Sequence, residues 1–209
     1  SGGVAGWISA YNTAHETNYQ ITETAFPKSS PYGWNNYPYD YWNIWVNHAG
    51  TTEYMEEPTL EILTSQYHVI IFKHCYPVSD IVEDSGTADI TSASRQIQNY
   101  KLQYNALKQK MLTFPDNRFI VWTGAARKQS DTNEANATRA QQFFDWVKDE
   151  WDADGDNIFV WDFWQLETEG GLYLTDDNAS GDSHPNSTFA AETAPLLGQR
   201  IVNVIEGRG

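Results

Sequence analysis

Residues 181–186, which read Gly-Asp-Ser-His-Pro-Asn, form the most specific chemical pattern in the sequence. Asp182 stands two residues before His184, so its carboxylate can hold the imidazole in one tautomer and stabilise it once it is protonated. Such a pair makes histidine an effective base for a serine hydroxyl. Pro185 restricts the backbone directly after His184. The segment therefore predicts the acid and the base of a catalytic triad, Asp182 and His184.

The elements that must position this pair alternate between strands and helices. Near-continuous apolar runs predict three buried parallel strands, and a β-branched alternating segment predicts a further short strand. This order builds an α/β fold, and we expect a three-layer α/β/α domain with a flavodoxin-like parallel sheet over residues 1–209. The strands are expected at residues 19–24, 68–73, 118–123 and 157–162, and the helices at residues 4–16, 59–66, 92–112, 133–151 and 189–205.

A parallel sheet binds its ligands outside the carboxyl ends of its strands. The segments expected there are residues 73–80, 123–128 and 162–166, together with the loop that holds Asp182 and His184. The first helix has no strand before it, although a doubly wound domain normally opens with one. The sheet is therefore expected to lack its first strand.

The layout and the Asp-Ser-His-Pro segment resemble hydrolases of the SGNH/GDSL superfamily. Those esterases carry their aspartate and histidine just before a final helix, usually as Asp-x-x-His-Pro. Here Asp182 and His184 are one residue closer together, which leaves Asp176 and Asp177 as alternative partners of the histidine. Residues 67–80 resemble the superfamily's third block, a buried strand followed by a loop with an oxyanion-binding asparagine.

The resemblance also implies a nucleophile and an oxyanion site. Ser1 opens the first helix and is followed by two glycines, similar to the His-His-Ser-Thr-Gly-Gly block of divergent members. Two alignments with this block are possible. Ser1 is either the nucleophile itself or the residue that follows the nucleophile, and in the second case the nucleophile is missing from this sequence. No asparagine stands in the loop of the third block. Its donors would be Ser79 or a backbone N–H near Cys75 and Tyr76, with Gly33 and the neighbouring Trp34 completing the oxyanion and substrate site.

These residues imply a serine esterase that needs no cofactor. The substrate class implied is a carbohydrate ester, such as an acetyl ester, or a similar polar molecule, and the location a secreted or cell-surface one. The aromatic segment at residues 32–45 would then form one wall of the cleft. The other interpretation of that segment is a structural aromatic cluster beneath a long loop.

The composition and net charge of the chain limit the classes of partner that it can bind. The formal net charge is −15, from 28 acidic and 13 basic residues. Such a surface repels phosphate backbones and disfavours binding to nucleic acid.

No apolar run reaches the roughly 18 residues that predict a membrane-spanning helix. With one cysteine, Cys75, no disulfide forms within the chain. The opening Ser1, without an initiator methionine, suggests an N-terminus that was processed or truncated.

Several alternatives remain open from the residues alone. A sheet without its first strand exposes an edge, which predicts a non-catalytic binding or assembly subunit that pairs with a missing N-terminal segment or with itself. An N-terminal-nucleophile hydrolase using the amine of Ser1 is disfavoured by the parallel sheet.

Single residues also leave alternatives open. Cys75 is either a thiol nucleophile or a small core residue. Residues 152–157 suggest an acidic turn rather than a calcium loop, and the histidine spacing predicts no metal site.

Overall fold

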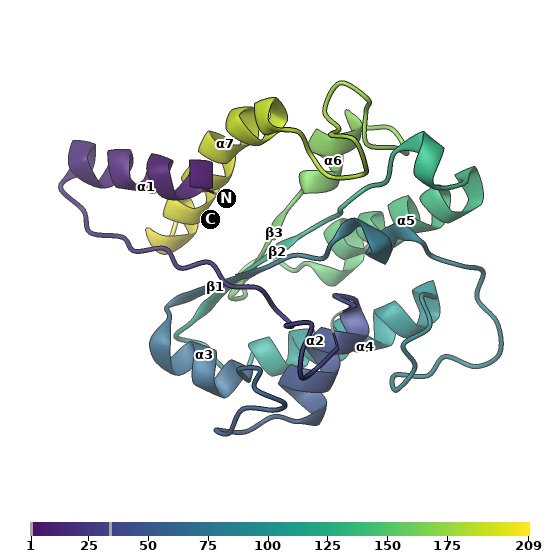
Figure 1. Cartoon of the computed structure of the whole chain (residues 1–209). Helices are drawn as coiled ribbons and strands as arrows, with labels where there is room; N and C mark the ends of the chain where they lie inside the picture. Colours follow the sequence, from purple (N-terminus) through teal and green to yellow (C-terminus); the bar gives the residue numbers. More distant parts are fainter. Residues whose placement is uncertain (1, 34) are drawn as a thin grey trace.

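Three parallel strands form the sheet in the computed structural model, which describes residues 2–33 and 35–209 (Figure 1). The strands are β1 (Val69–Phe72), β2 (Arg118–Trp122) and β3 (Ile158–Trp161), and they lie in the order β1-β2-β3. Ile70 of β1 is opposite Phe119 of β2, which is opposite Ile158 of β3. The three longer apolar runs thus form the predicted parallel strands, and the mixed helix and sheet architecture fits the α/β class.

Helices account for most of the remaining regular structure among the described residues. Short 3-10 turns occur at η2 (Tyr76–Ser79) and η3 (Gln129–Asp131), and π-helical turns at η1 (Asn43–Asn47) and η4 (Val147–Trp151). The α-helices are α1 (Gly2–His15), α2 (Pro38–Trp42), α3 (Leu60–Gln66), α4 (Ile97–Met111), α5 (Glu134–Trp146), α6 (Phe163–Thr168) and α7 (Ser187–Ile205).

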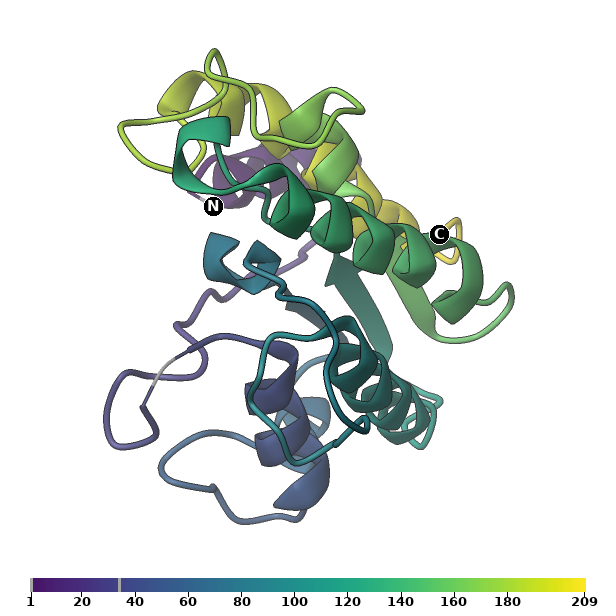
Figure 2. The ribbon, with the colours of Figure 1, turned by 90° about the vertical axis from the view of Figure 1, so that its right-hand side faces the viewer.

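The strand side chains divide the core into two clusters because successive residues point to opposite faces of a sheet. Phe119 joins a cluster with side chains of α2, α4 and α5, whereas the next residue, Ile120, joins a cluster with side chains of α1 and α7. Both side chains are fully buried. Figures 1 and 2 show α1 beside α7, on the other side of the strands from α2 and α4.

The predicted strand at residues 19–24 is wrong. These residues have no regular secondary structure and pair with no strand, and residues 20–25 are exposed. Asn12 accounts for the start of the segment: its Nδ2 donates to the Tyr19 carbonyl at 2.8 Å, and its Oδ1 accepts from the Tyr19 N–H at 2.9 Å. A side chain thus takes the backbone groups of Tyr19 that a strand ladder would use.

The aromatic segment at residues 32–45 is largely structural. Tyr41, Trp42 and Trp45 are buried in the cluster that contains α2, α4 and α5. The Tyr41 hydroxyl donates to the Lys73 carbonyl at 2.8 Å, just beyond the end of β1. These three buried rings therefore support the end of β1, as the structural interpretation of the segment predicted, and they line no cleft, whereas Trp34 lies outside the described residues.

Most helix predictions are correct in type and differ at their ends. Thr59 caps α3 through its side chain, so that the helix begins one residue later than predicted. The helix predicted at 92–112 begins at Ile97, and the one predicted at 133–151 changes from α to π geometry after Trp146. The short helices α2 and α6 were not predicted, because their five and six residues are too few to show a periodic pattern.

Candidate functional site

The loop before α7 has a defined shape because its two sides are hydrogen-bonded to each other. Ala179 and Pro185 form an isolated antiparallel bridge, and the Ser180 N–H donates to the His184 carbonyl at 2.8 Å. Asn186 then caps α7, its Oδ1 accepting from the Phe189 N–H at 2.9 Å. The histidine is thus carried on a closed loop that is fastened to the first turn of a long helix.

Asp182 and His184 form the pair that the sequence predicted. The Nδ1 atom of His184 lies 2.9 Å from both carboxylate oxygens of Asp182. Asp182 Oδ1 also accepts from the His184 N–H and from the Ser180 hydroxyl, each at 3.0 Å. These hydrogen bonds, the backbone N–H first, hold the pKa of Asp182 below its usual range. The carboxylate therefore stays ionised and orients the ring, which leaves Nε2 as the basic atom.

The shorter Asp-x-His spacing is sufficient for this pairing. Asp176, one of the two alternative partners, has a side chain that is 91% exposed and lies 3.9 Å from the Lys128 ammonium. The His184 and Asp182 side chains are 55% and 53% exposed, respectively. The pair is therefore accessible to solvent and to a substrate. Its hydrogen bond is not needed to compensate a buried charge.

The basic atom of His184 faces the segment that follows β1. Cys75 Sγ lies 3.8 Å from His184 Nε2. The Tyr76 ring packs edge-on against the imidazole, with 4.8 Å between the ring centroids. The Tyr76 ring also contacts Arg127, which follows β2: the guanidinium carbon lies 4.7 Å from the ring centroid. The carboxyl ends of β1 and β2 therefore meet the histidine loop, as expected for a parallel sheet.

Cys75 is held by an asparagine that the sequence analysis did not single out. The Cys75 N–H donates to Asn36 Oδ1 at 2.6 Å, so that this backbone donor, expected at the oxyanion site, is already used. Asn36 Nδ2 donates to the Phe26 carbonyl at 2.8 Å. The backbone of Asn36 is left-handed, with φ of 63°, a conformation that asparagine tolerates better than most residues. An asparagine in a loop is the sequence signal that could have indicated this left-handed position.

His74, next to Cys75, has a structural role. Its Nδ1 lies 3.0 Å from the Asn36 carbonyl oxygen and its Nε2 lies 2.8 Å from the Tyr104 hydroxyl. The side chain is buried, and burial lowers the pKa of His74 to about 3. It is therefore neutral at physiological pH and is not the base of this site.

Ser183, between the two members of the pair, joins the loop to the segment after β2. Its hydroxyl donates to Asp131 Oδ2 at 2.6 Å and accepts from the Lys128 N–H at 3.1 Å. The side chain is fully buried. The serine of the Asp-Ser-His segment is thus a structural tie with both hydrogen-bonding roles filled, and not a nucleophile.

Of the remaining predicted site residues, one is buried and engaged elsewhere, one is exposed, and two lie outside the described residues. Ser79 is 2% exposed, and its hydroxyl donates to the Ala125 carbonyl at 2.6 Å instead of facing a ligand. Gly33 has a φ of 93° and open space where a side chain would stand, which places it on the surface. Ser1 and Trp34 lie outside the described residues.

Glu167 is a buried carboxyl beside the site. Its Oε2 accepts from the Ala126 N–H at 2.8 Å, while its Oε1 has no partner among the described residues. Burial raises the pKa of Glu167 to about 8, so the group is largely protonated at neutral pH. Gly124 has a φ of 96°, and a Cβ there would lie 2.9 Å from Glu167 Oε2, so the loop after β2 favours glycine at this position.

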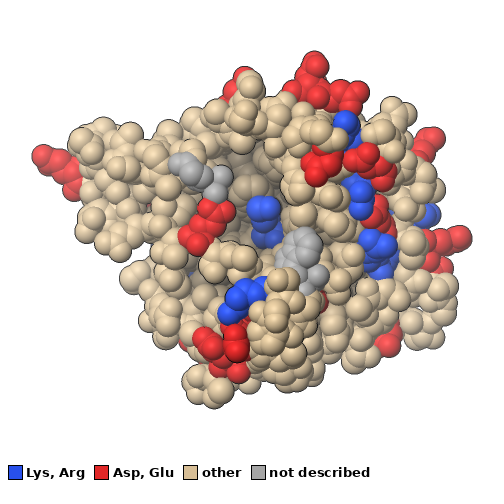
Figure 3. Space-filling model, in the orientation of Figure 1, with Lys and Arg blue, Asp and Glu red and all other residues tan. Residues whose placement is uncertain are grey.

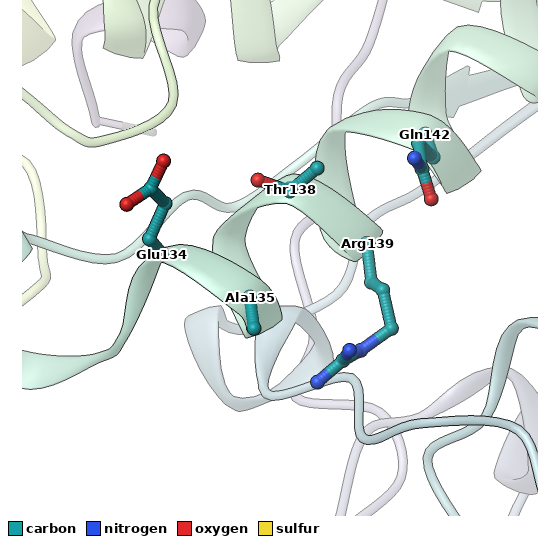
Figure 4. A pocket seen from close by; sticks show the side chains of 5 residues that line it. All are labelled: Glu134, Ala135, Thr138, Arg139 and Gln142. Atoms are coloured by element: carbon teal, nitrogen blue, oxygen red, sulfur yellow. The ribbon is translucent and has the colours of Figure 1, made fainter.

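Other surface features offer less chemistry. Figure 3 shows one face of the molecule hollowed near its centre, with acidic side chains around the rim and a basic side chain in the hollow. An open depression on α5 is lined by side chains that include no histidine or cysteine (Figure 4). Its arginine, Arg139, already donates to the Ile81 carbonyl and to Asn136. The Asp182–His184 pair is therefore the best-formed chemical site.

No family model matches the sequence, and no curated protein or solved structure shows a significant match to it. Within residues 2–33 and 35–209, no three His, Cys, Asp or Glu side chains gather in a way that would hold a metal ion. In the same residues, no helix combines the length and the apolar character needed to cross a membrane.

Proposed function

We propose that the chain is an ester hydrolase of the SGNH/GDSL type, with a three-layer, flavodoxin-like α/β/α fold. The observation that carries the proposal is the contact of His184 Nδ1 with both oxygens of Asp182, at the carboxyl edge of a parallel sheet. An ionised carboxylate on Nδ1 leaves Nε2 free to remove a proton, which is the role of histidine in acyl-transfer triads.

The proposed reaction needs a nucleophile at Nε2. His184 takes its proton as it attacks the acyl carbon and returns that proton to the leaving alcohol, while Asp182 stabilises the transient imidazolium. In the serine version of this mechanism the nucleophile is Ser1. Because the Cys75 N–H and the Ser79 hydroxyl are already engaged, Gly33 and the N–H of Tyr76 are the remaining proposed oxyanion donors.

The substrate class is proposed from the openness of the site. A histidine that is 55% exposed accommodates an acyl group attached to a bulky polar molecule, which fits a carbohydrate ester better than a lipid. The negative formal charge of −15 favours neutral substrates over anionic ones. A secreted or cell-surface location, where such esters are abundant, is part of the same proposal.

The test compares two histidine-to-alanine variants with p-nitrophenyl acetate as the substrate. His184→Ala should lower kcat/KM by about 100-fold or more, because proton transfer by a positioned base contributes at least that much. His68→Ala is the matched control: His68 is exposed and stands at the opposite, amino end of β1. Equal activity in the two variants, both folded by circular dichroism, would contradict the proposal.

Ser1→Ala tests the serine version separately. A loss of turnover equal to that of His184→Ala supports Ser1 as the nucleophile. Unchanged turnover in Ser1→Ala, with loss in His184→Ala, keeps the base and moves the nucleophile to another group.

The second candidate is a binding or assembly subunit. Among the described residues, the outer edge of β1 pairs with no other strand, so its backbone groups remain available to a further strand. This candidate predicts dimers or larger assemblies, measured by light scattering during gel filtration. A monomer with full esterase activity would refute it.

A further inference from the structure

The atom that faces the basic nitrogen of His184 is a thiol sulfur. Cys75 Sγ, His184 and Asp182 form a continuous series: 3.8 Å from Sγ to Nε2, then 2.9 Å from Nδ1 to the carboxylate oxygens. The first distance lies within the longer range of hydrogen bonds to sulfur. A nucleophile next to a base that a third group orients is the signature of covalent acyl transfer.

We infer that Cys75 is the nucleophile that His184 activates, and that the acyl group is carried on it as a thioester. This inference rests on the proposed function, since it names the attacking group of the same site. The attacking group is then the Cys75 thiol, which follows β1, instead of the Ser1 hydroxyl.

The position of Cys75 is well fixed, as a nucleophile requires. Its N–H is anchored to Asn36 Oδ1 at 2.6 Å, and it directly precedes the 3-10 turn η2. The neighbouring Tyr76 ring packs edge-on against His184 and so holds the imidazole beside the sulfur. Cys75 is partly buried and is therefore neither a core residue nor a fully solvated one. Both partners of the Sγ–Nε2 contact are thus positioned by other residues.

The charges around the sulfur favour activation by a base. Burial raises the pKa of the Cys75 thiol, so that the sulfur rests protonated and needs a proton acceptor to react. Lys73, the N–H of Tyr76 and Arg127 act in the opposite direction and lower the pKa, whereas the Asp182 carboxylate adds to the effect of burial. His184 supplies the acceptor. This combination describes a thiol that becomes nucleophilic when its proton moves to the imidazole.

The chemistry balances with water as the only co-substrate. His184 Nε2 removes the thiol proton, Sγ bonds to the acyl carbon, and the carbon–oxygen bond of the ester breaks as His184 protonates the leaving alkoxide. The acid part of the ester is then held on Sγ. Water, deprotonated by His184, attacks the thioester, and the thiolate leaves and recovers its proton. The products are a carboxylic acid and an alcohol.

A thiol experiment reports on this site alone, because Cys75 is the only cysteine of the chain. The folded protein is treated with iodoacetamide at neutral pH, and the alkylated fraction is followed by intact mass. We expect His184→Ala to slow alkylation by about tenfold or more, and the matched control His68→Ala to leave it unchanged. Equal alkylation rates in the wild type and His184→Ala would overturn the inference.

Turnover and trapping complete the test. With p-nitrophenyl acetate, Cys75→Ala should lose turnover to the same extent as His184→Ala, and acid-quenched wild type should carry one acetyl group that neutral hydroxylamine removes. Cys75→Ser, which keeps a nucleophile of similar size, is the variant that guards against a folding defect, and it should form the acetyl ester more slowly.

The outcomes separate the two levels of argument. Turnover that is lost in His184→Ala but kept in Cys75→Ala overturns the thiol nucleophile and leaves the esterase proposal standing. Turnover that is unchanged in both variants overturns the esterase proposal. In that case a His184-dependent alkylation rate would still establish that the histidine activates the thiol.

Discussion

The pair of Asp182 and His184 is formed by residues so close in sequence that little else is needed to bring them together. Asp182 also accepts the N–H of His184, so one carboxylate fixes both the backbone and the ring of the same histidine. Sequence reasoning found this pair because its contacts are local. The role of Ser183 could not be found in this way, since its partners Lys128 and Asp131 lie more than fifty residues earlier in the chain.

Asp182→Asn should lower kcat/KM for p-nitrophenyl acetate by about 100-fold or more. The amide keeps the shape but cannot stabilise the imidazolium, and it favours the wrong tautomer of His184. Steady-state kinetics with a melting curve for each variant provide the measurement. Ser180→Ala is the control: it removes one of the hydrogen bonds to Asp182 and should cost less than about tenfold. A larger effect of Ser180→Ala would contradict the central role of the carboxylate.

The closed loop and the helix that follows it act as one structural unit. Asn186 Oδ1 caps α7, and its Nδ2 donates to the carbonyls of Asp177 and Ala179 at 2.7 and 3.2 Å. One side chain thus ties the first turn of α7 to the opposite side of the loop. The orientation of His184 consequently depends on a residue that does not touch it.

Asn186→Ala should lower the free energy of unfolding by about 1–2 kcal/mol, the usual cost of removing a helix cap, and should also reduce turnover. Asn186→Asp separates the two roles. It keeps the cap acceptor but sets a carboxylate oxygen against the two loop carbonyls in place of the amide donor, so we expect the loop to be displaced and activity to fall at least as far as in Asn186→Ala. Urea denaturation and ester hydrolysis measure the two effects. Full activity in Asn186→Asp would show that the donors do not position the histidine.

Across the whole molecule, the sheet separates two cores and gathers the site at one edge. The buried Glu167 lies beneath that edge, bonded to the loop after β2. Because the pKa of Glu167 is raised to about 8 in the folded protein, from an ordinary value of 4.5, the folded state holds a proton that the unfolded state releases between these values. Its contribution therefore lowers stability as pH rises from about 4.5 to 8.

Glu167→Gln should flatten this part of the stability profile. One proton released on unfolding corresponds to a slope of at most about 1.4 kcal/mol per pH unit. Relative to the wild type, the variant should therefore gain stability at pH 8.5 compared with pH 5.5. Urea midpoints at the two pH values measure the difference. A parallel pH response in the two proteins would show that Glu167 does not carry the buried proton.

The sequence by itself determined the five longer helices, the three longer strands and the Asp182–His184 pair, but not the short helices α2 and α6. These features depend on periodicity, apolar runs and neighbouring residues, which are local properties of a chain. It misassigned residues 19–24, because a strand exists only where another edge pairs with it.

Only the tertiary structure determined which side chain lies next to the Nε2 atom of His184. Cys75 and His184 are 109 positions apart, and they come together because β1 ends at the same edge of the sheet as the loop before α7. The same folding engaged the Ser79 hydroxyl with Ala125 and the Cys75 N–H with Asn36. Residue types can suggest donors and nucleophiles, but the packing of distant segments determines which of them remain free to react.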